Sequence, residues 1–299
     1  MRSWLSSAGE RGLAGAQFLL EGADRGLGDA LRTTRFLRGK LTFRPRVDDV
    51  YVVTYPRSGT TWVQFVLHLL RAQGEPLGFH HISQVSPWWE RSMALGSRRS
   101  EDFEALDAPR IFKSHLPRGW LPGPGRFIYV VRDGLDVAVS YYELYRSHLG
   151  FDGSFEAFFE RFLRGRVQYG SWFRHVEGWR RYADDPKVLM VRYEDLRSDL
   201  DDSAARFAEF LGWSRSPEAI RQACAQASFS AMKAHEEKFD PITETLLDQG
   251  LHRGRFLRSG RSGDGARAVT EDMRSRFEAL RGSPQRLPHL EARLPDFLH

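Results

Sequence analysis

Cysteine, lysine and long apolar runs are scarce in this chain of 299 residues. Cys224 is the only cysteine, so no intrachain disulfide can form and the composition does not indicate an oxidising compartment. The apolar stretch from Leu13 to Leu20 is too short to span a membrane and is interrupted by Gly15 and Gln17. These absences exclude a disulfide framework and predict a cytoplasmic protein without stable membrane insertion.

Arginine, by contrast, is abundant. Five lysines and thirty-nine arginines outweigh the acidic residues and give a net charge of +5 and a pI near 9.5. This balance fits a protein that binds a multiply anionic small ligand, and it also fits nucleic-acid binding. Because the arginines are scattered rather than gathered into one stripe, we expect no nucleic-acid partner.

No linker, repeat or break in composition divides the chain. We therefore predict one domain over residues 1–299, with an N-terminal helical extension over 1–44 and a C-terminal tail over 283–299. The extension mixes basic and apolar residues, so binding to a membrane surface is an alternative to packing on the domain.

The segment from Tyr55 to Trp62 is the most informative part of the sequence. It follows the apolar run Val50 to Val53, which predicts a short buried strand, and it leads into Thr61 to Ala72, where apolar residues recur at helical spacing. A strand that enters a helix through a tight turn leaves backbone N–H groups directed at one point, which binds anions. The segment therefore predicts a phosphate-binding loop; the alternative is an ordinary turn in which threonines cap the helix.

This loop differs from the Walker A motif of kinases. When Gly59 is aligned with the second glycine of that motif, Thr54 takes the place of the first glycine and Thr60 that of the lysine. One cation, Arg57, remains. The other polar or ring-bearing side chains of the loop belong to Ser58, Thr60, Thr61 and Trp62. Such a set suits a phosphate next to a stackable ring and does not require magnesium.

The string Pro-Arg-Ser-Gly-Thr-Thr-Trp at positions 56–62 resembles the 5′-phosphosulfate loop of the cytosolic sulfotransferases. These enzymes take a sulfuryl group from 3′-phosphoadenosine 5′-phosphosulfate (PAPS) and release 3′,5′-adenosine bisphosphate. The resemblance implies that the donor is bound by Arg57, Ser58, Gly59, Thr60, Thr61 and Trp62. The family usually has lysine at the Arg57 position, and arginine keeps the charge but cannot donate a proton. The excess of arginine over lysine, with abundant alanine and glycine, predicts a bacterial member.

A second string, from Val130 to Tyr142, is similar to the family's segment for the 3′-phosphate. Arg132 and Ser140 stand at the matching positions. Arg132 leaves the carboxyl end of the apolar run Phe127 to Val131, where open α/β sheets bind their ligands. The alternatives are a surface salt bridge for Arg132 and an ordinary helix serine for Ser140.

The string from Ile111 to Pro117 resembles the segment with the family's catalytic histidine, which corresponds to His115. An acceptor hydroxyl must lose its proton as it attacks sulfur, and histidine is an effective base at neutral pH. The resemblance adds Lys113 to the catalytic set with Arg57. We expect Lys113 to point to the opposite side of a regular strand, so that only a local bend would bring it to the donor. The alternative is a structural histidine at a strand end.

Two further stretches resemble the family's nucleotide-binding segments. Tyr193 ends a predicted buried strand at the position of an adenine-contacting tyrosine, and Ser228 and Phe229 match a Thr-Ser-Phe segment, with Ala227 in place of threonine. For Tyr193 and Phe229 the alternative is core packing. A last loop that grips the 3′-phosphate is matched only in part. The matching residues are Leu257, Arg258 and Gly260, whereas Ser259 replaces a lysine and Gly265 a tryptophan.

Sulfuryl transfer needs positioning and cations in an in-line displacement. Arg57 is therefore expected at the 5′-phosphate and the departing oxygen, with help from Lys113. Adjacent tryptophans at Trp88 and Trp89 suggest an aromatic wall; the alternative is that they cover the core. Such a wall favours a small aromatic or polycyclic acceptor with a hydroxyl or amine. His80 and His81 lack further ligands at a recognisable spacing, so no metal is expected.

The predicted fold is a three-layer α/β domain with a central parallel sheet, because strands and helices alternate. The predicted strands are Val50 to Thr54, Arg110 to Ser114, Phe127 to Val131 and Val188 to Tyr193. The resemblance implies a P-loop-like sulfotransferase topology. Two alternatives stay open: a small-molecule kinase of related fold, and a catalytically weak nucleotide-binding scaffold. The oligomeric state is also open.

Overall fold

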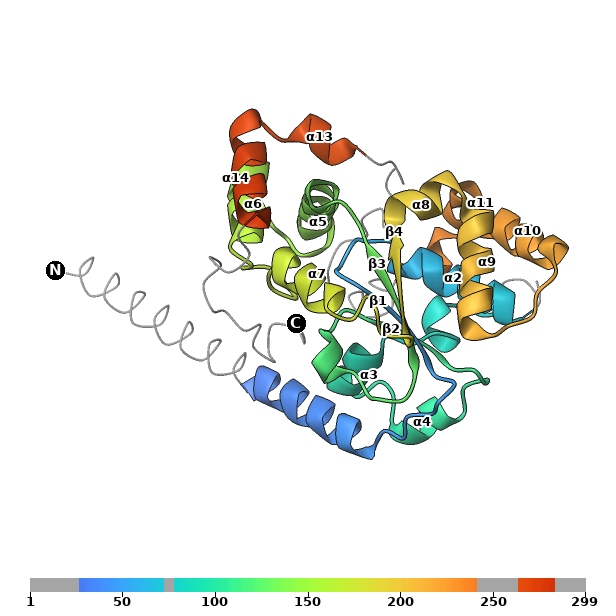
Figure 1. Ribbon diagram of the computed structural model, residues 1–299. Coiled ribbons are helices and arrows are strands. Elements are labelled where there is room, and N and C mark those ends of the chain that lie inside the picture. Colours follow the sequence, from blue (N-terminus) through green and yellow to red (C-terminus); the bar gives the residue numbers. More distant parts are fainter. Residues whose placement is uncertain (1–26, 73–77, 241–262, 283–299) are drawn as a thin grey trace.

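The computed structural model describes residues 27–72, 78–240 and 263–282 (Figure 1). At its centre lies a four-stranded parallel sheet in the order β2-β1-β3-β4. The strands are β1 (Val50–Thr54), β2 (Ile111–Ser114), β3 (Arg126–Val131) and β4 (Val188–Arg192). The predicted α/β fold is confirmed, and each predicted strand agrees with the observed one to within a residue at either end.

Side-chain alternation along the strands builds a core on both faces of the sheet. In β1, Val50 and Val52 join one apolar cluster, while Tyr51 and Val53 join the other. The Tyr51 ring stacks between rings of the two neighbouring strands, with centroid distances of 5.3 Å to Phe112 and 5.1 Å to Phe127. Because both faces are covered, β1, β3 and β4 are mostly continuous apolar runs, as expected for a parallel sheet, whereas β2 ends in Lys113 and Ser114.

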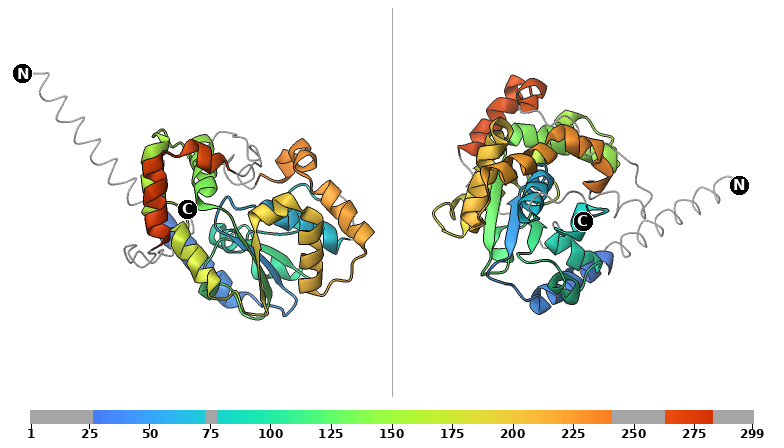
Figure 2. Two further views of the ribbon diagram at one scale, coloured as in Figure 1. Left: turned by 45° about the horizontal axis from the view of Figure 1, so that its top comes forward. Right: turned by 90° about the vertical axis from the view of Figure 1, so that its right-hand side faces the viewer.

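Helices form a layer on each side of the sheet (Figures 1 and 2). One layer contains α3 (Trp89–Leu95), α4 (Ser100–Glu104), α5 (Gly134–His148), α6 (Phe155–Leu163), α7 (Trp172–Arg180) and α14 (Glu271–Arg281), with α13 (Asp264–Ala268) against α5. The other contains α2 (Thr60–Arg71), α8 (Tyr193–Ser198), α9 (Leu200–Leu211), α10 (Pro217–Gln226) and α11 (Phe229–Ala234). Short 3₁₀ turns are η1 (Ile82–Gln84), η2 (Arg118–Trp120) and η3 (Glu236–Lys238).

Part of the predicted N-terminal extension is helical. Residues 27–42 form a helix whose Phe36 packs edge-on against Trp89 at 5.8 Å. Residues 1–26 and the predicted tail over 283–299 lie outside the described part of the chain, so the predicted domain bounds stay predictions. Within the described ranges, no helix is both long and apolar enough to cross a bilayer.

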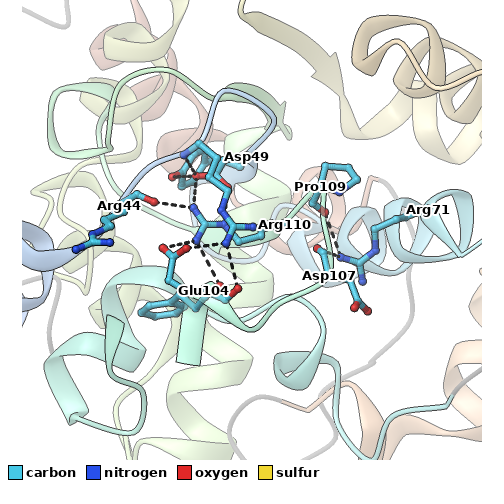
Figure 3. A network of polar contacts seen from close by, with 10 residues as sticks. Arg44, Asp49, Arg71, Glu104, Asp107, Pro109 and Arg110 are labelled. Carbon is cyan, nitrogen blue, oxygen red and sulfur yellow. Dashed lines mark hydrogen bonds and ion pairs between the residues drawn. The ribbon is translucent and has the colours of Figure 1, made fainter. Parts of the chain in front are cut away.

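A buried ion pair fixes the amino ends of β1 and β2 (Figure 3). Arg110, fully buried, donates Nε to Oδ1 of Asp49 at 2.7 Å and Nη2 to Oδ2 at 2.8 Å. Its Nη2 also donates to the Arg44 carbonyl, and its Nη1 donates to Glu104. This two-pronged contact ties the chain entering β1 to the chain entering β2. The opposite, carboxyl ends of the strands are thereby held in register for the loops that follow them.

Candidate active site

The turn between β1 and α2 has the strained geometry expected of an anion-binding loop. Gly59, which precedes α2, has φ 92° and ψ 16°, and a Cβ added there would lie 2.8 Å from the ring of Tyr193. Only glycine fits both the left-handed backbone and this close approach. Arg57 also has a positive φ of 69°, which is costly for a residue with a side chain. The predicted loop is therefore a rigid turn whose shape is determined by contacts from elsewhere in the chain.

Two other segments of the chain hold Arg57. Its Nε donates to Oγ of Ser140 on α5 at 3.1 Å, and its carbonyl accepts from Nη1 of Arg132, directly after β3, at 2.9 Å. Burial, and next the nearby charge of Arg132, lower the pKa of Arg57 to about 10. The structure thus brings together Arg57, Arg132 and Ser140, which the sequence analysis assigned to two phosphates of one ligand. Two arginines so close together form a site for a multiply charged anion.

Hydroxyl groups line the same loop. The Ser58 hydroxyl is buried and has no hydrogen-bond partner in the part of the chain that the structure describes. Such a group needs an explanation, and a ligand oxygen would provide one. The Thr60 hydroxyl, by contrast, is bonded to the Thr54 hydroxyl at 2.6 Å, and Thr61 lies buried in the first turn of α2. The residues present therefore fit a bound phosphate or phosphosulfate group.

Aromatic side chains predicted for the adenine lie beside the loop. The Trp62 indole donates to the Ala227 carbonyl at 2.8 Å, and its ring meets Tyr193 edge-on at 6.0 Å. Tyr193 is the first residue of α8 and not, as predicted, the end of a strand. Ser228 and Phe229 follow Ala227, with Ser228 capping α11 through a bond from the Ala231 amide. The segments at 62, 193 and 227–229 thus meet at one edge of the loop.

His115 lies directly after β2, buried, and its tautomer follows from its partners. Nδ1 is 2.8 Å from the carbonyl oxygen of Thr54, which can only accept, so Nδ1 carries the proton. The neutral ring then has its lone pair on Nε2. Burial, with the charge of Lys113 as the next cause, places the pKa of His115 well below its usual value. The imidazole is therefore neutral at pH 7 and able to accept a proton at Nε2.

Lys113 lies on the same side of β2 as His115, which makes the predicted opposite orientation wrong. Both contact the ring of Trp88: the Lys113 ammonium is 3.8 Å from its centroid, and the His115 ring is 5.0 Å away. Residues two positions apart in a strand share a face, so no bend is needed. Burial, partly offset by Glu90, lowers the pKa of Lys113 to about 7. This lysine changes its charge near neutral pH.

Three residues around His115 were not singled out from the sequence. The amide of His115 donates to Oε1 of Glu90 at 2.9 Å, and its carbonyl accepts from Nε2 of His175 at 2.9 Å. The Tyr169 ring lies edge-on to the imidazole at 5.1 Å, and Tyr169 has a positive φ of 66°. A strained tyrosine and a buried glutamate are the kind of features found at active sites. In the sequence, the only local signal was an acidic residue directly after two tryptophans.

The C-terminal loop is only partly covered. Leu257, Arg258 and Gly260, predicted to bind the 3′-phosphate, lie outside the described residues. Just beyond them, the Asp136 carboxylate accepts from the Gly263 amide at 2.9 Å and the Gly265 amide at 2.6 Å. A Cβ at Gly265 would lie 2.4 Å from the backbone of Leu135, so no side chain fits there. The glycine that replaces the family's tryptophan is thus required by close packing on α5.

The predicted aromatic wall is half correct. Trp88 lies at the site against Lys113, His115 and Tyr169. Trp89, in contrast, is fully buried and packs on the rings of Phe36 and Phe43. The two neighbouring tryptophans face different surroundings because Trp88 forms a parallel bridge with Lys113 of β2, whereas Trp89 begins α3. Among the described side chains, no group of three or more potential ligands could hold a metal ion.

The model of the "Sulfotransferase domain" family matches residues 47–284. Mouse "Sulfotransferase 2B1" is 36% identical over 251 residues, which cover 80% of this chain and 72% of that protein. Two solved structures are similar. Retinol dehydratase, in complex with androsterone and the inactive cofactor PAP, has a TM-score of 0.68 and 26% identity over 82% of this chain and 84% of that one. Mouse sulfotransferase SULT7A1, complexed with PAP, has a TM-score of 0.64 and 27% identity over 86% and 92%.

Proposed function

We propose that this chain, which belongs to the sulfotransferase domain family, moves the sulfuryl group of PAPS to a hydroxyl or amine of a small aromatic or polycyclic acceptor. Family membership makes it a sulfotransferase. The donor is supported by the two similar structures, which are both complexes with PAP. It is also supported by the loop after β1, where Arg132 donates to the Arg57 carbonyl and the buried Ser58 hydroxyl has no partner among the described residues.

The observation that carries the mechanism is the hydrogen bond from His115 to Thr54. Because Nδ1–H is held by the Thr54 carbonyl, Nε2 is the nitrogen that can take the proton of an acceptor hydroxyl. The acceptor oxygen then forms its bond to sulfur as the bond from sulfur to the 5′-phosphate oxygen breaks, and that oxygen keeps the electron pair. Arg57 and Lys113 supply positive charge where this negative charge collects.

Donor binding divides among the segments already described. The loop at 57–62 would hold the 5′-phosphosulfate, Arg132 and Ser140 the 3′-phosphate, and the aromatic group of Trp62, Tyr193 and Phe229 the adenine. Ser228 would contact the nucleotide beside Phe229, and Leu257, Arg258 and Gly260 would complete the 3′-phosphate contacts. PAPS supplies the activated sulfuryl group when bound. No metal takes part in this proposal, because arginines and amides can neutralise the charge.

An aromatic or polycyclic acceptor is supported by the rings next to His115. Trp88 and Tyr169 lie nearly parallel, at 6.2 Å and 21°, and both meet the imidazole edge-on. An apolar ring placed here would bury its surface while its hydroxyl reached Nε2 of His115. One similar structure is a complex with androsterone, a further reason to begin with steroids and phenols.

Calorimetry tests the donor first. We expect 3′,5′-adenosine bisphosphate to bind tightly with or without magnesium, and ATP to bind weakly under both conditions. A preference for ATP with magnesium would support a kinase and overturn the proposal. Binding of neither nucleotide would also contradict it.

The second experiment separates catalysis from binding. We expect His115→Ala to lower transfer from radiolabelled PAPS to a phenol or steroid panel by about 10²–10⁴-fold, with bisphosphate affinity close to that of the unmodified protein. Undiminished transfer by His115→Ala would remove histidine as the base. A matched control is His80→Ala, which replaces an exposed histidine.

The remaining assignments are proposals of the same kind. We place the protein in the cytoplasm, as one sulfotransferase domain over 1–299 acting on a small molecule, without a nucleic-acid partner. A bacterial source rests on composition alone, since Sulfotransferase 2B1 and SULT7A1 come from the mouse and lend it no support. Size-exclusion chromatography with light scattering would determine the oligomeric state.

A further inference from the structure

Glu90 is a fully buried carboxyl group at the centre of the catalytic cluster. Its Oε1 accepts from the Trp88 indole at 2.7 Å, from the His115 amide at 2.9 Å and from the Tyr169 hydroxyl at 3.3 Å. Indole and amide nitrogens only donate, so Oε1 carries no proton. Its other oxygen, Oε2, is buried without a hydrogen-bond partner within the described ranges. Buried carboxyl groups rarely keep such an oxygen without a reason.

Two cations lie over the ring of Trp88, which donates to Glu90: Lys113, at 3.8 Å from the ring centroid, and Arg91, at 5.1 Å. Lys113 makes no ion pair with a described carboxylate, yet its ammonium rests on the face of the indole that donates to Glu90. Trp88 therefore lies between Glu90 and Lys113, bonded to one through its N–H and to the other through its ring. A negative charge behind the indole makes the ring a better site for a cation.

We propose that Glu90 is a positioning residue with two tasks: Oε1 fixes the backbone of His115, and the carboxylate charge keeps Lys113 protonated during transfer. The second task rests on the proposed function, since it matters to catalysis only if Lys113 faces the departing oxygen. In this proposal Glu90 acts through His115, Trp88 and Lys113.

The other charges around Lys113 act in both directions. Burial is the largest cause that lowers its pKa, and Arg91 and Arg57 lower it further, whereas Glu90 and Asp240 raise it. Glu90 is the first of the two raising charges and lies on α3, directly against β2. The pKa of Glu90 itself is raised by burial, and the hydrogen bonds from the backbone amide and the indole oppose that rise. Loss of either charge should therefore shift the protonation of the other group.

Glu90→Gln tests the charge with little change in shape. The amide oxygen can still accept the three hydrogen bonds at Oε1, while the negative charge is lost. The chain has five lysines, so selective ¹³C-lysine labelling gives few signals, and Lys113→Met assigns the one of interest. We expect the pH midpoint of Lys113 to fall by about one unit or more in Glu90→Gln. An unchanged midpoint would overturn the proposal.

Glu104→Gln is the matched control. It removes the same charge from a half-exposed glutamate that contacts Arg110, just before the start of β2. The Lys113 midpoint should not move in this variant. A shift equal to that of Glu90→Gln would mean that net charge alone is responsible, and would also overturn the proposal.

A second variant keeps the proposal testable if Glu90→Gln does not fold. By reciprocity, removal of the lysine charge in Lys113→Met must make Glu90 easier to protonate. We expect the carboxylic-acid infrared band of Glu90 to appear at higher pH in Lys113→Met than in the unmodified protein. The same spectrum for both proteins would contradict the coupling.

Activity gives the last measurement. Protonated Lys113 is the active form, so transfer should decline as pH rises through its midpoint, and in Glu90→Gln the decline should begin at lower pH. If transfer by Glu90→Gln and by the unmodified protein declined over the same alkaline pH range, Glu90 would not keep Lys113 protonated. The NMR and infrared measurements need no donor, so their results would not change if the sulfotransferase proposal failed. Failure of that proposal can therefore be distinguished from failure of the proposal on Glu90.

Discussion

The guanidinium of Arg57 and the hydroxyl of Ser140 meet at 3.1 Å across 83 positions of sequence. Arg57 follows β1, and Ser140 lies on α5, which begins two residues after Arg132 at the end of the neighbouring strand β3. The parallel sheet brings both segments to one edge, so the cation is oriented by the protein itself. A group that is positioned in advance needs no reorganisation when charge develops on a ligand.

The left-handed backbone at Arg57 predicts that a residue with a side chain lowers the stability of the fold at this position. At φ 69°, glycine is unstrained and alanine is not, so Arg57→Gly should be more stable than Arg57→Ala by about 1 kcal/mol. Urea unfolding of the two variants measures the difference. Equal stability, or a more stable alanine variant, would show that the backbone there is not strained.

We predict that bisphosphate binding and transfer need a positive charge at position 57, and that lysine can largely replace arginine there. Both truncated variants should lose bisphosphate affinity and transfer, whereas Arg57→Lys should retain transfer within about tenfold, because lysine keeps the charge but not the planar contact with Ser140. Calorimetry and a transfer assay on the three proteins test this. Loss of transfer in Arg57→Lys as severe as in the truncations would mean that the guanidinium is specifically needed.

Asp136 is predicted to anchor the C-terminal loop. Its two oxygens accept the amides of Gly263 and Gly265, and Asp136→Asn would place an NH₂ group against one of them. We expect a loss of about 1–3 kcal/mol in stability and weaker binding of the bisphosphate. Asp133→Asn, which alters the cap of α5 but not this contact, is the control. Unaltered bisphosphate affinity in Asp136→Asn would contradict the anchoring role.

Lys113 predicts a pH dependence of stability. The unfolded chain keeps the lysine proton to the ordinary pKa of 10.5, while the folded protein releases it near 7, so the unfolded state binds more protons between these values. Stability therefore rises with pH across this window, by up to about 1.4 kcal/mol per pH unit. Compared with Lys113→Met, the unmodified protein should gain stability from about pH 7 to about pH 10. Parallel unfolding curves would refute this; Lys187→Met, at an exposed site, is the control.

The ion pair between Asp49 and Arg110 is predicted to support the fold without entering the site. Asp49→Asn removes the buried carboxylate partner of Arg110 and leaves only the half-exposed Glu104, so it should cost about 3–5 kcal/mol. Bisphosphate affinity of the folded variant should stay unchanged, because the pair lies at the amino ends of the strands (Figure 3). A large loss of affinity with little loss of stability would reverse this assignment.

The sequence by itself determined the strands of the sheet and the tight turn between β1 and α2. Both depend on local properties: runs of apolar residues of strand length, and small and hydroxyl residues between a strand and a helix. The order of the strands was known only from the structure, but a parallel sheet places the carboxyl ends of its strands together. For this reason Arg57, His115, Arg132 and Tyr193, each at or just after a predicted strand end, could be assigned to one site before any distance was known.

Only the tertiary structure decided how His115 is held. Glu90 accepts a hydrogen bond from the His115 amide, 25 residues away in the sequence. Tyr169 donates to Glu90 over a separation of 79 residues, and His175 donates to the His115 carbonyl over 60 residues. No local pattern encodes such contacts, because they depend on which way α3 and α7 face when they pack on the sheet. The same packing decided that Trp88 faces the site and its neighbour Trp89 faces the core. The spacing of residues in a sequence shows which side chains share one face of a helix or strand. What that face packs against depends on the folding of the whole chain.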